Sequence, residues 1–226
     1  MKLDQWMTDF YSQSWYRVTD PINGPLYHPG LYEWRIAPAN HEHLREAHSK
    51  GFELVETMVE FVTKVSPVEK EYTGIRLARP EDIQTIYDIT YERYILNKRF
   101  YTRFKNQNYF TLTDAYRYYK LTISNYFNNP DCYTSVIEIN GKVVGYYMLL
   151  DTKEDNLFRG IMTGILPEAI GKGYHIKMQH FLFNVIGRDI FTLNKTQLNN
   201  LNTINNHIKE KRVLKHIEHI FYKKVD

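Results

Sequence analysis

A glycine-containing loop, residues 167–173, constrains the fold of this chain more than any other segment. An apolar run at 158–166 precedes it, and apolar residues recur at helical spacing from Tyr174 to Ile186. Glycine lets the backbone approach a ligand closely, and the first turn of a helix presents free N–H groups to an anion. This order of strand, loop and helix suits a bound pyrophosphate, although a tight turn without a ligand produces the same spacing.

Composition and charge exclude several classes of protein. The chain has 226 residues, enough for one large domain or one domain with a small companion. A net charge of +3, with scattered Lys and Arg, is too small to indicate nucleic-acid binding. The longest apolar stretch, 143–150, is too short to span a bilayer, and the N-terminus lacks the apolar core of a signal peptide. We expect a cytoplasmic protein that binds neither nucleic acid nor a membrane. The sequence leaves open whether it forms a homodimer.

Cysteine and histidine placement gives no sign of a metal site. The single cysteine, Cys132, excludes an internal disulfide and fits a reducing compartment. The histidines of the segment 41–48 lack the spacing of a zinc-binding helix. His216 and His219 would face opposite sides of a strand. We therefore expect no metal.

Two regions are separated by a polar, proline-containing stretch at 65–71, which predicts domains at 1–68 and 69–226. In the second region, Asn140-Gly141 between alternating apolar runs predicts a hairpin. The expected elements there are strands at 75–78, 133–139, 143–150, 158–166, 190–195 and 213–222, and helices starting at 79–82 and 113 and spanning 174–186 and 199–210. A polar turn is expected at 151–156. In the first region, a helix at 40–50 and a strand at 54–61 look like a degenerate copy of 202–211 and 214–221, which suggests that the two copies pack as equivalent edges of the sheet.

These features resemble the GCN5-related N-acetyltransferases (GNAT family). Arg79-Pro80-Glu81-Asp82 matches the family's first helix opening, and residues 168–173 match its Gln/Arg-x-x-Gly-x-Gly/Ala loop, with Glu168 at the first position. The resemblance implies an α/β (α+β) fold, in which a mixed central sheet is flanked by helices and a small N-terminal half-domain is added. It implies acetyl-coenzyme A as co-substrate. A carboxylate beside a pyrophosphate is repelled, so Glu168 should point away from it.

The resemblance also implies roles for particular residues. Backbone N–H groups of Gly164, Ile165 and Leu166 would hold the acetyl carbonyl, with a strand bulge at Gly164 or, alternatively, a glycine there that only relieves crowding. Either Asn200 or Asn202 would contact the coenzyme arm. The family's helical tyrosine is absent, so His207 is the candidate proton donor, with an ordinary surface histidine as the alternative. The loop residues that would hold the pyrophosphate are Ile170, Gly171, Lys172, Gly173 and Tyr174.

A narrower resemblance, to sugar-nucleotide N-acetyltransferases of the TDP-fucosamine acetyltransferase type, extends over most of the chain. It rests on three segments in the same order: 6–11, 40–61, and 98–125. It implies a nucleotide-linked amino sugar as partner, for surface polysaccharide synthesis. Arg103 and Arg117 are further candidates for its diphosphate. The residues predicted to bind the sugar nucleotide are Arg99, Phe100, Tyr101 and Asn125.

Two other functions stay open from the sequence. One is acetyl transfer to a different amine, such as a peptide N-terminus, a polyamine or a small metabolite. The other is a non-catalytic module that binds acyl-coenzyme A, which the missing tyrosine and Glu168 favour.

Overall fold

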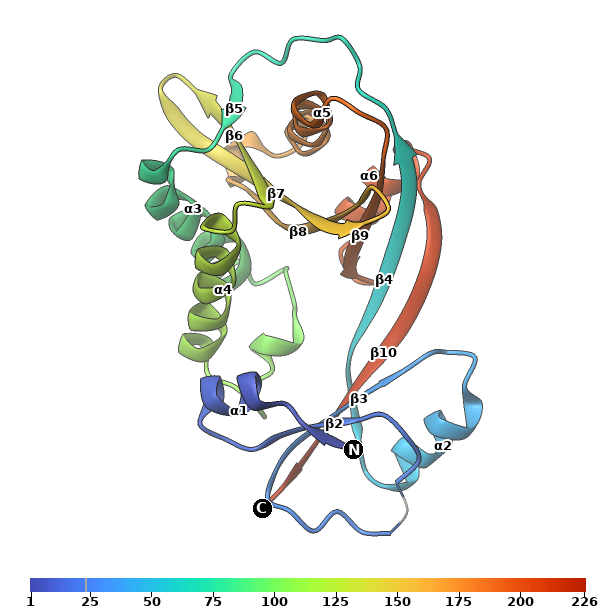
Figure 1. Cartoon of the computed structure of the whole chain (residues 1–226). Coiled ribbons are helices and arrows are strands. Elements are labelled where there is room, and N and C mark those ends of the chain that lie inside the picture. The colour runs from blue at the N-terminus through green and yellow to red at the C-terminus, as the bar shows by residue number, and fades with distance from the viewer. Residues whose placement is uncertain (23) are drawn as a thin grey trace.

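Ten strands form one continuous sheet in the computed structural model, which describes residues 1–22 and 24–226 (Figure 1). The order across the sheet is β1-β2-β3-β10-β4-β9-β8-β7-β6-β5. All neighbours are antiparallel except β2–β3 and β8–β9, which are parallel. The strands are β1 (Lys2–Leu3), β2 (Trp15–Val18), β3 (Gly30–Ile36), β4 (Glu53–Val65), β5 (Ile75–Leu77), β6 (Cys132–Ile139), β7 (Lys142–Glu154), β8 (Leu157–Ile165), β9 (Ile190–Gln197) and β10 (Val213–Val225).

Helices cover both faces of this sheet. They are α1 (Gln5–Tyr11), α2 (His41–Ser49), α3 (Ile83–Thr90), α4 (Leu112–Phe127), α5 (Tyr174–Ile186) and α6 (Leu201–Lys209). A π-helical segment, Tyr91–Leu96, continues α3. Among the described residues, no helix has the length and hydropathy that crossing a membrane would require.

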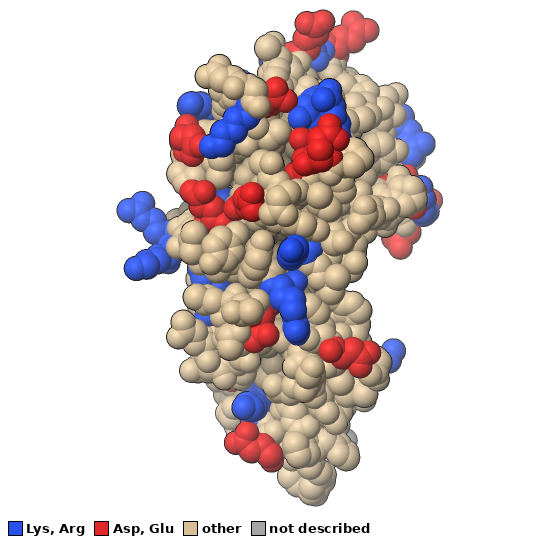
Figure 2. Space-filling view, turned by 90° about the vertical axis from the view of Figure 1, so that its left-hand side faces the viewer, with Lys and Arg blue, Asp and Glu red and all other residues tan. Residues whose placement is uncertain are grey.

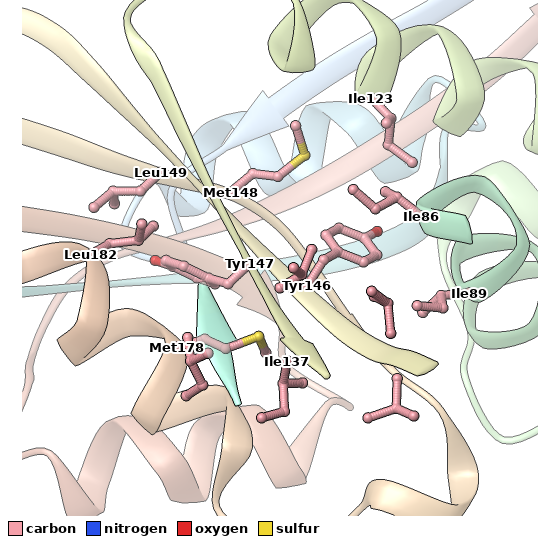
Figure 3. Close-up of a cluster of buried hydrophobic side chains, with 14 of the residues drawn as sticks. Ile86, Ile89, Ile123, Ile137, Tyr146, Tyr147, Met148, Leu149, Met178 and Leu182 are labelled. Carbon is pink, nitrogen blue, oxygen red and sulfur yellow. The ribbon is translucent and has the colours of Figure 1, made fainter. Parts of the chain in front are cut away.

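Successive residues of β7 show which helices share a face. Tyr146 shares a hydrogen bond with Thr90 of α3, whereas the next residue, Tyr147, packs edge-on against His175 of α5. Because side chains alternate along a strand, α3 and α5 lie on opposite faces. Figure 3 shows this core, with Tyr146 directed toward Ile86 and Tyr147 toward Leu182. α4 lies on the α3 face, since Ile123 joins the same side of the cluster.

Most predicted elements are confirmed, with small differences at their ends. Helix α5 has the predicted bounds, and the Asn140-Gly141 turn joins β6 to β7 with positive φ at both residues. The polar turn expected at 151–156 is shorter, because β7 continues to Glu154. Only Asp155 and Asn156 form the turn, both with positive φ. Short polar side chains tolerate this backbone region better than most.

The predicted internal repeat is present, but its two copies lie at the centre of the sheet and not at its edges. Helices α2 and α6 each have 9 residues, and strands β4 and β10 each have 13. Asn40 and Asn200 cap the two helices in the same way, each accepting from the backbone N–H three residues later. β4 and β10 pair antiparallel with each other, and Figure 1 shows them running together along the molecule.

The predicted boundary at residue 68 falls in the connection from β4 to β5. The two regions share one sheet, since β4 of the first region lies between β10 and β9 of the second. The division into domains 1–68 and 69–226 stays a prediction.

A buried ion pair fixes the segment between α3 and α4 onto β4. Arg103 donates to Glu56 through its guanidinium at 2.5 Å and through its backbone N–H at 3.2 Å. Both side chains are almost fully buried. The Thr102 hydroxyl beside this pair accepts from the Tyr119 hydroxyl of α4 at 3.0 Å. The residues preceding Thr102 are thereby held against the sheet.

Charges of both signs are interspersed on the side of the molecule that carries α3 and α4. Figure 2 shows Lys and Arg next to Asp and Glu there, without a large area of one sign. Lys64 and Asp189 form an ion pair in which both side chains are exposed. The pair of Arg103 and Glu56, in contrast, is buried.

We predict that Glu56→Ala destabilises the fold by about 3–5 kcal/mol, because it leaves the Arg103 charge buried without a partner. The measurement is the free energy of unfolding from urea denaturation. As a control, Lys64→Ala removes an exposed ion pair and should cost less than about 1 kcal/mol. Similar losses for the two variants would contradict the prediction.

Candidate active site

The sheet opens between β8 and β9. These parallel strands pair only from Leu157↔Phe191 to Gly160↔Asn194. Beyond this point each strand stays with its other neighbour, β9 with β4 as far as Gln197 and β8 with β7 as far as Ile165. The inner edges of both strands therefore have no strand partner there, which leaves a gap in the sheet toward their carboxyl ends.

Contacts at Gly160 set the point where the strands separate. The Tyr147 hydroxyl donates to Asn194 Oδ1 at 2.9 Å across the last paired position. A Cβ at residue 160 would lie 2.2 Å from Asn194 Oδ1 and 2.8 Å from the Tyr147 hydroxyl, so a larger residue here would displace this hydrogen-bonded pair. The register with β7 then shifts by one residue at Ile161, and such a bulge bends the strand.

The bulge predicted at Gly164 therefore lies three residues earlier, and this corrects the expectation. Gly164 pairs in register with Tyr146. A Cβ at residue 164 would lie 2.7 Å from the Tyr146 ring and 2.8 Å from Ile89. Packing explains this glycine, as the alternative from the sequence proposed.

A cavity of about 380 Å³ lies at the carboxyl end of β8, where the two strands have separated. Its walls come from the π-helical segment and Phe100 on one face of the sheet, and from the glycine loop, α5 and α6 on the other. The gap thus opens through the sheet. Of the predicted coenzyme-binding residues, all except Leu166 and Lys172 line it. The lining residues are Arg93, Tyr94, Phe100, Thr163, Gly164, Ile165, Ala169, Ile170, Gly171, Gly173, Tyr174, His175, Ile176, Asn200, Asn202, Thr203, Asn205, Asn206 and Lys209.

The glycine loop has the geometry of an anion-binding turn. Gly171 and Gly173 have φ of +82° and +72°, and a Cβ on either would meet no heavy atom within 4 Å. Gly173 immediately precedes α5 and has no capping side chain. The first backbone N–H groups of α5 have no partner within the helix and border the cavity. Glu168 points away, as predicted, toward Lys142 Nζ at 3.5 Å.

Only one of the three predicted N–H groups, those of Gly164, Ile165 and Leu166, is available to a ligand. Leu166 donates its N–H to the Val144 carbonyl of β7 at 2.8 Å. By the alternation of an antiparallel ladder, Gly164 also faces β7, whereas Thr163 and Ile165 face the gap. The Ile165 N–H is therefore the donor that borders the cavity.

Four asparagines of α6 or its cap line the cavity. The Asn200 amide is already engaged, since its Oδ1 accepts from the Thr203 N–H at 3.4 Å and its Nδ2 donates to Thr196 at 3.1 Å. Asn202 is exposed and makes no side-chain hydrogen bond with the described residues. Both predicted candidates thus border the cavity, and the amide of Asn202 is the freer one.

His207 does not face the cavity, in contrast to the expectation. Its side chain is 2% exposed and its ring lies 4.7 Å from that of Phe61. Burial, followed by the positive charge of Arg212, lowers its pKa to about 3, so the imidazole is neutral at pH 7. The geometry gives no support to the predicted role in proton donation.

The four predicted substrate residues are not brought into one pocket. Phe100 lines the first cavity, and Tyr101 lines a second cavity of about 360 Å³ together with Leu54, Val55, Glu56, Thr57, Leu198 and Asn199. Two consecutive residues thus line two different cavities. Arg99 and Asn125 are exposed and line neither. Of the other arginines considered, Arg103 is paired with Glu56, and Arg117 lies over the Phe10 ring at 4.2 Å.

Sequence reasoning missed Arg93, Tyr94 and Lys209, which all line the cavity. The spacing of Asn202, Asn205 and Lys209 on one face of α6 was a signal that could have found Lys209. No comparable signal existed for Arg93 and Tyr94, because they lie on a π-helical segment after α3. Among the described residues, no group of three or more His, Cys, Asp or Glu side chains could hold a metal ion.

The fold is similar to several solved structures. A functionally unknown conserved protein from Staphylococcus epidermidis matches with a TM-score of 0.65 and 14% identity, over 87% of this chain and 73% of that one. A GCN5-related N-acetyltransferase from Sphaerobacter thermophilus matches with a TM-score of 0.58 and 14% identity, over 89% and 62%. A tandem GNAT protein from the clavulanic acid biosynthesis pathway matches with a TM-score of 0.56 and 10% identity, over 86% and 64%.

This chain therefore has the fold of the GCN5-related N-acetyltransferases, as the resemblance implied. It spans less than two thirds of the length of the last two structures. No protein-family model and no curated protein sequence matches it. At these identities structural similarity establishes a fold and no narrower type, so the sugar-nucleotide type stays a prediction.

We predict that acid destabilises the fold through its buried histidines. Burial lowers the pKa of His207 to about 3 and of His175 to about 4. Since an unfolded imidazole has a pKa of about 6.5, the unfolded chain binds more protons below that pH. The free energy of unfolding should fall from pH 6.5 toward pH 4, by up to about 1.4 kcal/mol per pH unit for each histidine.

Urea denaturation across this pH range provides the test. His207→Gln should flatten the pH dependence, because the variant lacks one of the two groups. The matched control is His41→Gln, since His41 is exposed on α2. An identical slope in His207→Gln and wild type would overturn the prediction.

Proposed function

We propose that this protein is an acetyl-coenzyme A-dependent N-acetyltransferase. The observation that carries the proposal is the cavity at the carboxyl end of β8, where this strand has separated from β9, with the glycine loop and the start of α5 among its walls. The fold supports it, because the named neighbours of this fold include N-acetyltransferases. Thiol release from acetyl-coenzyme A in the presence of a panel of amines tests it. Binding without thiol release would leave a coenzyme-binding module.

The residues of the cavity fit this substrate. The N–H groups at Gly171–Tyr174 can donate hydrogen bonds to a pyrophosphate, and the Lys209 ammonium on the cavity wall adds positive charge. The pantetheine arm carries amides, which can bond to the unpaired edge of β8. The acetyl oxygen would then accept from the Ile165 N–H, and the amine would approach from the side of Phe100.

For the acceptor we propose a nucleotide-linked amino sugar. Support comes from the narrower sequence resemblance and from the aromatic rings of Phe100 and Tyr101, which line the first and the second cavity. A diphosphate needs a cation, and Arg93 is suited to it. This arginine lines the first cavity and has no ion-pair partner among the described residues, whereas Arg99 lies outside both cavities.

We predict that Gly173→Ala weakens acetyl-coenzyme A binding by at least tenfold. A Cβ there projects into the open space at the cavity and restricts the backbone at positive φ. Calorimetry measures the binding. Gly141→Ala is the matched control, because Gly141 has a φ of +76°, open space around its Cβ, and a place in the hairpin turn of β6 and β7. Both variants should lose about 1 kcal/mol of stability, and only the first should lose affinity.

We also predict that Arg93→Ala raises the KM of the nucleotide-linked sugar about tenfold or more, because it removes charge-assisted bonds to the diphosphate. The KM of the free amino sugar and of acetyl-coenzyme A should stay unchanged. Arg99→Ala is the matched control and should behave as wild type. Steady-state kinetics with both acceptors measure this. Equal rates for free and nucleotide-linked sugar would remove the sugar-nucleotide proposal and leave acetyl transfer to another amine.

A further inference from the structure

The Tyr94 hydroxyl occupies the unpaired edge of β8, on the side that faces the gap. It donates to the Thr163 carbonyl at 2.8 Å, and both residues line the first cavity. Tyr94 belongs to the π-helical segment after α3, so it reaches the strand from the face opposite to α5 and α6. Single π-helical turns often occur at functional sites, because the extra residue re-aims the side chains that follow.

The Tyr94 hydroxyl lies beside the Ile165 N–H, which also faces the gap. In an extended strand, the carbonyl of residue 163 and the N–H of residue 165 point to the same side, and a single residue of a parallel neighbour would bond to both. No strand takes that place here, since the pairing with β9 has ended at Gly160↔Asn194. Tyr94 supplies the donor to the carbonyl. An oxygen that accepts from the Ile165 N–H would lie within hydrogen-bonding reach of the phenol.

The surroundings of Tyr94 hold it in this position as a neutral donor. Its ring packs at 4.9 Å against Phe100 and at 4.8 Å against Tyr119. Burial raises the pKa of its hydroxyl to about 12, while the hydrogen bond to the Thr163 carbonyl acts in the opposite direction. The phenol stays protonated around neutral pH, and rotation about its C–O bond can redirect the proton from the carbonyl to a ligand.

We propose that the Tyr94 hydroxyl and the Ile165 N–H together form the oxyanion hole of this site. The proposal rests on the proposed acetyl transfer. The amine nitrogen bonds to the acetyl carbon, and the carbonyl electron pair moves onto the oxygen between the two donors. The pair returns as the C–S bond breaks, the coenzyme leaves with the sulfur, and the nitrogen loses its proton to water. Tyr94 lends a hydrogen bond throughout and keeps its proton.

This assignment explains how the site can work without a donor on α6. The helix has no tyrosine, and His207 is buried against Phe61. Preorganised donors aimed at a developing charge contribute more than any other single effect in many acyl transfers. The donor that this chain offers comes from the opposite face of the sheet.

Infrared spectroscopy of bound acetyl-coenzyme A, with its acetyl carbonyl labelled with ¹³C, tests the hydrogen bonds directly. Binding to wild type should lower the carbonyl stretching frequency, and Tyr94→Phe should lose part of that shift. Tyr94→Phe should also lower kcat by about 10²–10³-fold, with little change in the KM of acetyl-coenzyme A. The matched control is Tyr146→Phe, which removes a buried phenol bonded to Thr90 and outside the cavity. It should leave the carbonyl frequency as in wild type.

The outcomes separate this inference from the proposed function. Wild-type protein that fails to bind acetyl-coenzyme A would overturn both. An unchanged carbonyl frequency and kcat in Tyr94→Phe, with binding intact, would overturn only the role of Tyr94. Should Tyr94→Phe fail to fold, Tyr94→ring-fluorinated tyrosine replaces it. Its more acidic hydroxyl should lower the carbonyl frequency further, and an unchanged frequency would again overturn the role.

Discussion

The antiparallel pairing of β4 with β10 is the constraint on which the rest of this structure depends. It places a strand from the first third of the chain next to the last strand, and it gives β9 a full-length partner on its outer side. β9 stays paired with β4, and β8 stays paired with β7. β8 and β9 can therefore separate from each other while both remain part of the sheet. The separation leaves backbone groups without a strand partner along the inner edges of β8 and β9, where a ligand can satisfy them.

The same strand also shapes the other side of the cavity. Glu56 of β4 pairs with Arg103, and this fixes the chain that carries Phe100 and Tyr101. Replacing both partners with apolar residues of similar volume could keep the fold, whereas loss of one partner leaves a buried charge. The first region of the chain therefore contributes to the site by positioning residues of the second. A description of the site in terms of residues 69–226 alone would omit this anchor.

Local signals in the sequence predicted those parts of the structure that local physics determines. The Asn-Gly turn, the bounds of α5 and the glycine loop depend on backbone preferences within a few residues. The central position of β4 depends on pairing between residues far apart in the chain, and no local pattern contains it. Similarly, the sequence predicted that His207 faces the ligand, whereas it packs against Phe61 of the sheet. Helical spacing alone does not show which side of α6 the sheet covers. Tyr94 was missed, since a π-helical segment breaks the spacing of 3.6 residues on which the prediction relied.

The paired copies at the centre of the sheet, α2 with β4 and α6 with β10, also bear on how the sheet assembles. A strand that pairs with its own copy across the two-fold axis of a dimer must pair antiparallel, because such an interface uses the same surface of both subunits. Here both strands belong to one chain, so their pairing is an intramolecular event. Its effective concentration is set by the polypeptide that links them and not by the amount of protein in solution. The centre of this sheet is an interface that the chain makes with itself.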